Sequence, residues 1–204
     1  VVKEGGTQWM HAGKGIVHSE RPSQEIIDQQ GENEIIQFWV NAPAKHKMDE
    51  PNYQPLTPED MPTVISKDKK VKVGVVAGEF NKKTSKIDTY SPLLILRLDI
   101  EKGGKMDIPV PEDFNAMMYV LDGEIEINAN KTAKTKDFIE FNNDGASFSI
   151  EGKADTRAIL LSGSPLNESV STYGPFVMNT QREIMAALKD YQSGKMGVLV
   201  EKFD

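Results

Sequence analysis

The sequence contains no cysteine among its 204 residues. That absence excludes a disulfide framework and a thiol nucleophile, and it leaves the redox compartment undefined. Any metal ion held by side chains must therefore be bound by histidine nitrogen and carboxylate oxygen. Histidine is itself scarce, because His11, His18 and His46 are the only three imidazoles in the chain.

Long apolar runs are also missing. No stretch approaches the roughly 20 apolar residues that span a bilayer, and residues 1–6 show no signal-peptide pattern. We therefore expect a cytoplasmic protein, or a nuclear one in a eukaryote, with no membrane partner. The chain opens at Val1 rather than at methionine, which indicates that the natural N-terminus lies elsewhere.

Basic residues are fewer than acidic ones. The 24 basic and 31 acidic residues give a formal net charge of −7. A field of that sign repels phosphate, so we expect no direct binding of nucleic acid. The densest basic run, residues 67–72, contains Asp68 and is interpreted as a solvated entry to a strand.

Most of the remaining sequence predicts short β-strands separated by polar turns. The pair Asp122-Gly123 predicts a hairpin, because this dipeptide suits a tight turn with positive φ. Residues 35–40 alternate little and are expected to be buried on both faces. Strands at this spacing indicate an antiparallel barrel or sandwich. The expected strands are residues 35–40, 71–77, 93–100, 117–121, 124–128, 138–141 and 157–161.

Two segments interrupt this pattern. Residues 41–62 carry five prolines among charged residues, which predicts a linker or long loop. Thr180 and Glu183 form a capping box that begins a helix over residues 180–193, and Gly194 is expected to end it. An apolar stripe on that helix is expected to be buried, and it consists of Ile184, Ala187, Leu188 and Tyr191.

The tripeptide His18-Ser19-Glu20 is the candidate chemical site. On an extended strand, positions i and i+2 point to the same face, so the imidazole and the carboxylate could reach one ion. These donors suit Fe(II), Mn(II) or Zn(II). Two ligands do not make a firm site, however, and the alternative interpretation is a surface ion pair near a turn.

Longer motifs surround this tripeptide. The segment from Gln8 to Glu20 reads Gln-Trp-Met-His-Ala-Gly-Lys-Gly-Ile-Val-His-Ser-Glu and closely resembles the signature of the pirin family. Further agreement extends the resemblance over essentially the whole chain. It is carried by residues 37–41, 43–45, 50–54 and 173–180.

The resemblance implies an all-β protein of two cupin barrels with one metal ion, usually iron, in the N-terminal barrel. The family's ligands are a His-x-His pair on an earlier strand, followed by the positions matched here by His18 and Glu20. The sequence has no His-x-His, so we expect that pair upstream of Val1. We interpret His11 as a local variant and His46 as a solvated linker residue.

The resemblance also implies a division of the chain. Residues 1–42 would be the C-terminal part of the metal-binding cupin, 43–66 a linker, 67–165 a metal-free second cupin, and 166–204 a tail and helix packed on the first cupin. Apolar residues around Ile108 and Val110 stand where a metal-binding cupin has histidines. Residues expected to fill the core are Met106, Met117, Met118, Trp9 and Trp39, the two tryptophans being alternatively pocket-lining.

Three functions remain open. The first is an Fe(II)-dependent dioxygenase that opens quercetin-like flavonols, with His18 and Glu20 as ligands and Glu20 as the base for a substrate hydroxyl. The second is a non-enzymatic, iron-responsive regulator that binds a protein partner, such as a transcription factor or a metabolic enzyme. The third is an inert fragment with an incomplete first barrel, which would self-associate through open sheet edges.

Overall fold

The structure is a computed structural model and describes residues 2–199. The chain divides into two compact units, one made of residues 10–53 and 167–199 and the other of residues 2–9 and 54–166. Strands β1 (Thr7–His11) and β2 (Asn52–Leu56) form a two-stranded sheet, and the division between the units falls within both strands.

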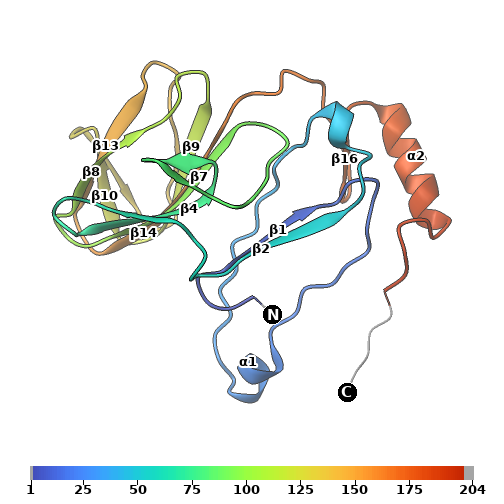
Figure 1. Cartoon of the computed structure of the whole chain (residues 1–204), viewed down its shortest axis with the longest axis horizontal. Helices are drawn as coiled ribbons and strands as arrows, with labels where there is room; N and C mark the ends of the chain where they lie inside the picture. Colours follow the sequence, from blue (N-terminus) through green and yellow to red (C-terminus); the bar gives the residue numbers. More distant parts are fainter. Residues whose placement is uncertain (1, 200–204) are drawn as a thin grey trace. The chain divides into compact units, whose positions relative to one another are not determined.

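The larger unit contains two antiparallel sheets (Figure 1). The six-stranded sheet has the order β12-β9-β14-β7-β4-β3, and the four-stranded sheet has the order β11-β10-β13-β8. A small hairpin joins β5 (Glu79–Phe80) to β6 (Lys83–Thr84). The strands of the larger sheet are β3 (Thr63–Ile65), β4 (Val71–Ala77), β7 (Leu93–Ile100), β9 (Asn115–Asp122), β12 (Phe138–Glu140) and β14 (Thr156–Gly163). Those of the smaller sheet are β8 (Lys105–Pro109), β10 (Glu124–Ile127), β11 (Lys131–Lys134) and β13 (Ser147–Gly152).

A single apolar core joins the two sheets. Along β9 and β13 buried residues alternate with more exposed ones, because successive side chains of a strand point to opposite faces. The cross-strand pair Leu160 and Leu96 comes from one sheet and the pair Phe148 and Ile108 from the other, and all four belong to the same buried cluster. The larger unit is therefore a two-sheet jelly roll, and the expected all-β fold class is confirmed.

The expected hairpin at Asp122-Gly123 is wrong. β9 pairs with β12 and β14, whereas β10 pairs with β11 and β13, so the chain passes from one sheet to the other at Gly123. Gly123 has φ +91°, and a Cβ atom there would lie 2.2 Å from the carbonyl oxygen of Asp155. The glycine is required at a tightly packed corner, where a side chain would clash with the neighbouring backbone.

The smaller unit carries little sheet. It contains α1 (Gln24–Asp28), a 3₁₀ turn η1 (Ala44–His46), a hairpin of β15 (Ser171–Tyr173) with β16 (Phe176–Met178), and α2 (Gln181–Gln192). Within the described part of the chain, no helix is both long and apolar enough to cross a bilayer.

The strand expected at residues 35–40 is not formed. Ile35 and Trp39 are each 65% exposed, so neither the predicted burial nor the interpretation of Trp39 as a core residue holds. The physical reason is the lack of a neighbour, since a strand must pair its backbone N–H and C=O groups. No described strand pairs with this segment.

Helix α2 begins and ends as its sequence predicts. Thr180 is the N-cap, and its Oγ1 accepts a hydrogen bond from the amide of Glu183 at 3.2 Å. At the other end, Gly194 has φ +76°, and its amide and that of Lys195 donate to the carbonyls of Tyr191 and Asp190, which is a Schellman motif.

The apolar stripe of α2 is buried less completely than expected. Ile184 is 1% exposed, Ala187 and Leu188 are half-buried, and Tyr191 is 54% exposed. The helix lies against β15 and β16, two short strands that cover only part of its face (Figure 1). The ring of Tyr191 meets the ring of Phe176 edge-on, with centroids 6.1 Å apart.

Candidate metal centre

The loop that leads to His18 is anchored on the segment around Asp49. The amide of Lys14 donates to the carbonyl of Asp49 at 2.9 Å, and the ammonium group of Lys14 pairs with the carboxylate of Glu50. Gly13 has φ +51°, and a Cβ atom there would lie 2.0 Å from the carbonyl oxygen of Asp49. The glycine thus permits both the turn and the close approach of the two segments.

His18 and Glu20 lie beyond this loop, in a stretch that belongs to no strand. Their side chains nevertheless approach one another, with Nδ1 of His18 3.9 Å from Oε1 of Glu20. The side chains are 32% and 45% exposed. The side-chain nitrogen Nε2 of Gln37 donates to the second carboxylate oxygen, Oε2 of Glu20, at 3.2 Å. Oε1 of Glu20 therefore faces the imidazole of His18, while Oε2 is held by the side chain of Gln37.

The pair by itself does not satisfy a metal ion. Two donors at a right angle, each about 2.1 Å from one ion, lie roughly 3 Å apart, so Nδ1 and Oε1 would need only a small approach from 3.9 Å. A firm site also needs a third and a fourth donor. Among the described residues, no group of three or more histidine, aspartate or glutamate side chains could hold an ion.

The other two histidines are used elsewhere. Nε2 of His11, a residue that is only 8% exposed, donates to the carbonyl of His46 at 3.0 Å. Nδ1 of His46 lies 2.8 Å from Oδ2 of Asp49. The side chain of His46 is 29% exposed, so it is paired with a carboxylate rather than simply solvated.

A buried lysine in the same unit was not foreseen from the sequence. Lys47 is 6% exposed, and its Nζ donates to Oδ1 of Asn41 at 2.5 Å. Burial lowers the pKa of Lys47, and the nearby carboxylates of Glu168 and Glu183 partly offset this effect. The only sequence signal was a lysine in a proline-rich stretch, which normally indicates a solvated residue.

The described interior of the jelly roll is apolar. Ile108 and Val110 are 0% and 7% exposed and belong to its core. Met118 is fully buried and Met106 packs against the core, whereas Met117 is half-buried and lies outside that cluster.

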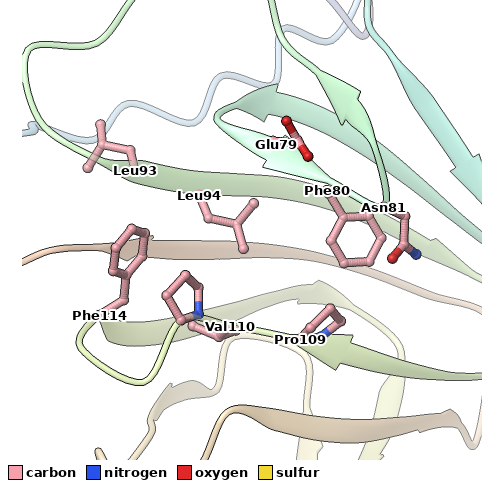
Figure 2. A pocket seen from close by; sticks show the side chains of 9 residues that line it. Glu79, Phe80, Asn81, Leu93, Leu94, Pro109, Val110 and Phe114 are labelled. Carbon is pink, nitrogen blue, oxygen red and sulfur yellow. The ribbon is translucent and has the colours of Figure 1, made fainter.

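A pocket of about 460 Å³ opens at one end of the jelly roll (Figure 2). Figure 2 shows Phe80, Leu94 and Phe114 around it, and Glu79 and Asn81 are its polar lining residues. A single carboxylate without an imidazole does not hold a transition metal. The His18–Glu20 pair is therefore the candidate centre.

Two known protein families match the sequence of this chain. The family described as "Pirin" matches residues 1–40, and the family described as "Pirin C-terminal cupin domain" matches residues 95–197. The chain belongs to the pirin family. The match to the C-terminal cupin of pirins begins in the jelly roll and extends through α2, and the His18–Glu20 pair lies in the match to the pirin family itself.

Several pirin relatives are similar over nearly the whole chain. A pirin-like protein from Solanum lycopersicum is 38% identical over 96% of this chain and 66% of its own length. A pirin-like protein from Caulobacter vibrioides is 37% identical over 96% of this chain and 69% of its own length. A crystal structure of quercetin 2,3-dioxygenase from Acinetobacter baumannii is 33% identical, with a TM-score of 0.89 over 98% of this chain and 69% of that one. The chain thus spans about two thirds of the length of these relatives.

Proposed function

We propose that the chain is part of a pirin-type dioxygenase that opens flavonols such as quercetin in an Fe(II)-dependent reaction. The observation that carries the proposal is the 3.9 Å approach of Nδ1 of His18 to Oε1 of Glu20. The similarity to the Acinetobacter quercetin 2,3-dioxygenase supports the choice of substrate class. The remaining metal ligands are proposed to come from polypeptide outside these 204 residues.

In this proposal the two residues have different roles. His18 supplies a neutral nitrogen donor, and Glu20 supplies a carboxylate oxygen. When bound, an iron ion would offer open positions for O₂ and a chelating substrate. Because Gln37 holds Oε2 of Glu20 at 3.2 Å, that oxygen is oriented and is the one proposed to accept the hydroxyl proton of the flavonol.

The test measures O₂ uptake with quercetin by the full-length gene product supplied with Fe(II). His18→Ala and Glu20→Gln are expected to abolish uptake, and the matched control Glu112→Gln to leave it unchanged. Glu112 is an exposed carboxylate of the jelly-roll unit. Full iron occupancy without quercetin turnover would reject the dioxygenase proposal.

A second candidate is a regulator that binds a protein partner. It is favoured by a cluster of exposed large apolar side chains in one short segment, since such clusters mark interaction surfaces. The cluster consists of Ile35, Ile36, Trp39 and Val40. Trp39→Ser would weaken binding of such a partner while leaving iron content unchanged, and retained binding would reject this candidate.

A further inference from the structure

The stretch that follows α2 returns to the segment that carries the candidate metal ligands. After the Schellman motif closes α2, the carbonyl of Met196 accepts a hydrogen bond from the amide of Val17 at 3.1 Å. Val17 immediately precedes His18. Within the described residues, this is the one backbone–backbone hydrogen bond made by residues 16–20. No strand ladder holds that stretch, so the tail provides its backbone anchor.

The side chain of Met196 makes a second contact with the same segment. It lies over Gly15, where an added Cβ atom would be 2.4 Å from Sδ, 2.6 Å from Cγ and 2.7 Å from Cε of Met196. Gly15 also has φ +113°, a conformation that L side chains rarely adopt. The methionine is half-buried and fills the space that the missing side chain of the glycine leaves.

The loop before His18 is therefore held from two sides. Asp49 holds its first half through the amide of Lys14, and Met196 holds its second half through Gly15 and Val17. Residues that orient metal ligands without touching the ion commonly change metal affinity by 10–100-fold when they are replaced. Met196 contacts Gly15 and Val17, which lead directly into His18.

We propose that Met196 is a positioning residue for the His18–Glu20 pair, and this inference rests on the proposed metal-binding function. The tail residue sets the path of residues 15–17, and that path sets where the imidazole of His18 meets the carboxylate of Glu20. Replacing Met196 by alanine loosens the path, because the contact with Gly15 is lost and the backbone hydrogen bond to Val17 loses its support.

Three variants test the inference. Met196→Ala removes the contact, Met196→Leu keeps its apolar volume, and Met185→Ala removes a methionine that is 65% exposed on α2 in the same tail. Amide hydrogen exchange of Val17 reports the anchor, and Mn²⁺-induced broadening of the His18 and Glu20 NMR signals reports binding of the ion by the pair. Both are measured on the full-length gene product, which is proposed to supply the remaining metal ligands.

We expect Met196→Ala to speed exchange of the Val17 amide about tenfold and to weaken Mn²⁺ binding at the pair about tenfold. Met196→Leu and Met185→Ala should behave like the wild type. Unchanged Mn²⁺ binding in Met196→Ala would overturn the inference even if exchange is faster, because Met196 would then support the loop without positioning the ligands.

The failure of the metal proposal itself has a different signature. If Mn²⁺ does not broaden His18 or Glu20 in the wild type, the pair is not a binding site under these conditions. The backbone order parameters of residues 17–20 then decide the positioning inference. A fall from about 0.85 to below about 0.6 in Met196→Ala, reversed in Met196→Leu, supports it, and equal values contradict it.

Discussion

The ammonium group of Lys47 donates a hydrogen bond to Oδ1 of Asn41 at 2.5 Å, from a residue that is only 6% exposed. Glu168 is close enough to act on the charge of Lys47, and its Oε2 accepts a hydrogen bond from the backbone amide of Ala44 at 2.8 Å. These contacts join the segment around residue 44 to the beginning of the C-terminal tail. They also place an ionisable group where its charge is poorly solvated.

The buried lysine predicts a rise in stability with pH. Burial lowers the pKa of Lys47 from its ordinary value of 10.5, so between the lowered pKa and 10.5 the unfolded chain binds more protons than the folded one. The free energy of unfolding of the wild type should therefore increase relative to Lys47→Met as pH rises towards 10.5. Urea unfolding at several pH values measures this difference. Lys45→Met, at an exposed neighbour, is the matched control, and parallel curves for wild type and Lys47→Met would contradict the prediction.

Glu183 predicts a pH dependence of the same sign, but in the acid range. The hydrogen bond from Thr180 holds the pKa of Glu183 below its ordinary value of 4.5. The folded state is thus stabilised above pH 4.5, and this contribution is lost as pH falls through the lowered pKa. Protection of the Ile184 amide should fall with acid in the wild type and stay nearly constant in Glu183→Gln, which keeps the capping geometry without a charge. Identical acid profiles would show that the carboxylate does not stabilise the helix start.

The apolar face of α2 should respond unevenly to truncation. Ile184 is 1% exposed and Leu188 is half-buried. Ile184→Ala should cost about 2–5 kcal/mol of unfolding free energy, and Leu188→Ala clearly less, because a partly exposed site loses less contact. Chemical denaturation of the two variants measures the order. An equal or larger loss for Leu188 would mean that the helix packs through a different face.

A buried hydroxyl in the jelly roll offers a stabilising change. Ser162 is 5% exposed, it stands opposite Leu94 and Ala116 in the sheet, and its Oγ has no hydrogen-bond partner among the described residues. Ser162→Ala should raise the free energy of unfolding by about 1 kcal/mol, because an unpaired polar group is removed from the core. Ser147→Ala, at an exposed position, is the control. A destabilised Ser162→Ala would reveal a partner for the hydroxyl.

Local patterns were sufficient for several elements. The strands at residues 71–77 and 93–100 have the predicted bounds, because apolar, largely β-branched or leucine-rich runs there are bounded by polar or turn-forming residues. Helix α2 was predicted from its capping box and its glycine stop, both of which the structure contains. In each case the information lies within a few neighbouring residues.

Other features depend on contacts that local patterns do not contain. Asp122-Gly123 has the chemistry of a hairpin turn, and the same chemistry serves a corner between two sheets. Residues 35–40 have the composition of a strand, but a strand also requires a partner. The approach of Gln37 to Glu20 and of Met196 to Gly15 joins distant parts of the sequence, and only the folded chain reveals it. The domain boundaries inferred from the pirin resemblance remain a prediction.

The location of iron in the full-length gene product tests the central claim most directly. Crystals grown with Fe(II) and measured at the iron absorption edge would show the ion by its anomalous scattering. The account predicts one ion about 2.0–2.2 Å from a ring nitrogen of His18 and a carboxylate oxygen of Glu20, with further ligands from outside these 204 residues. An iron ion bound elsewhere, with His18 and Glu20 ordered and free of metal, would contradict it.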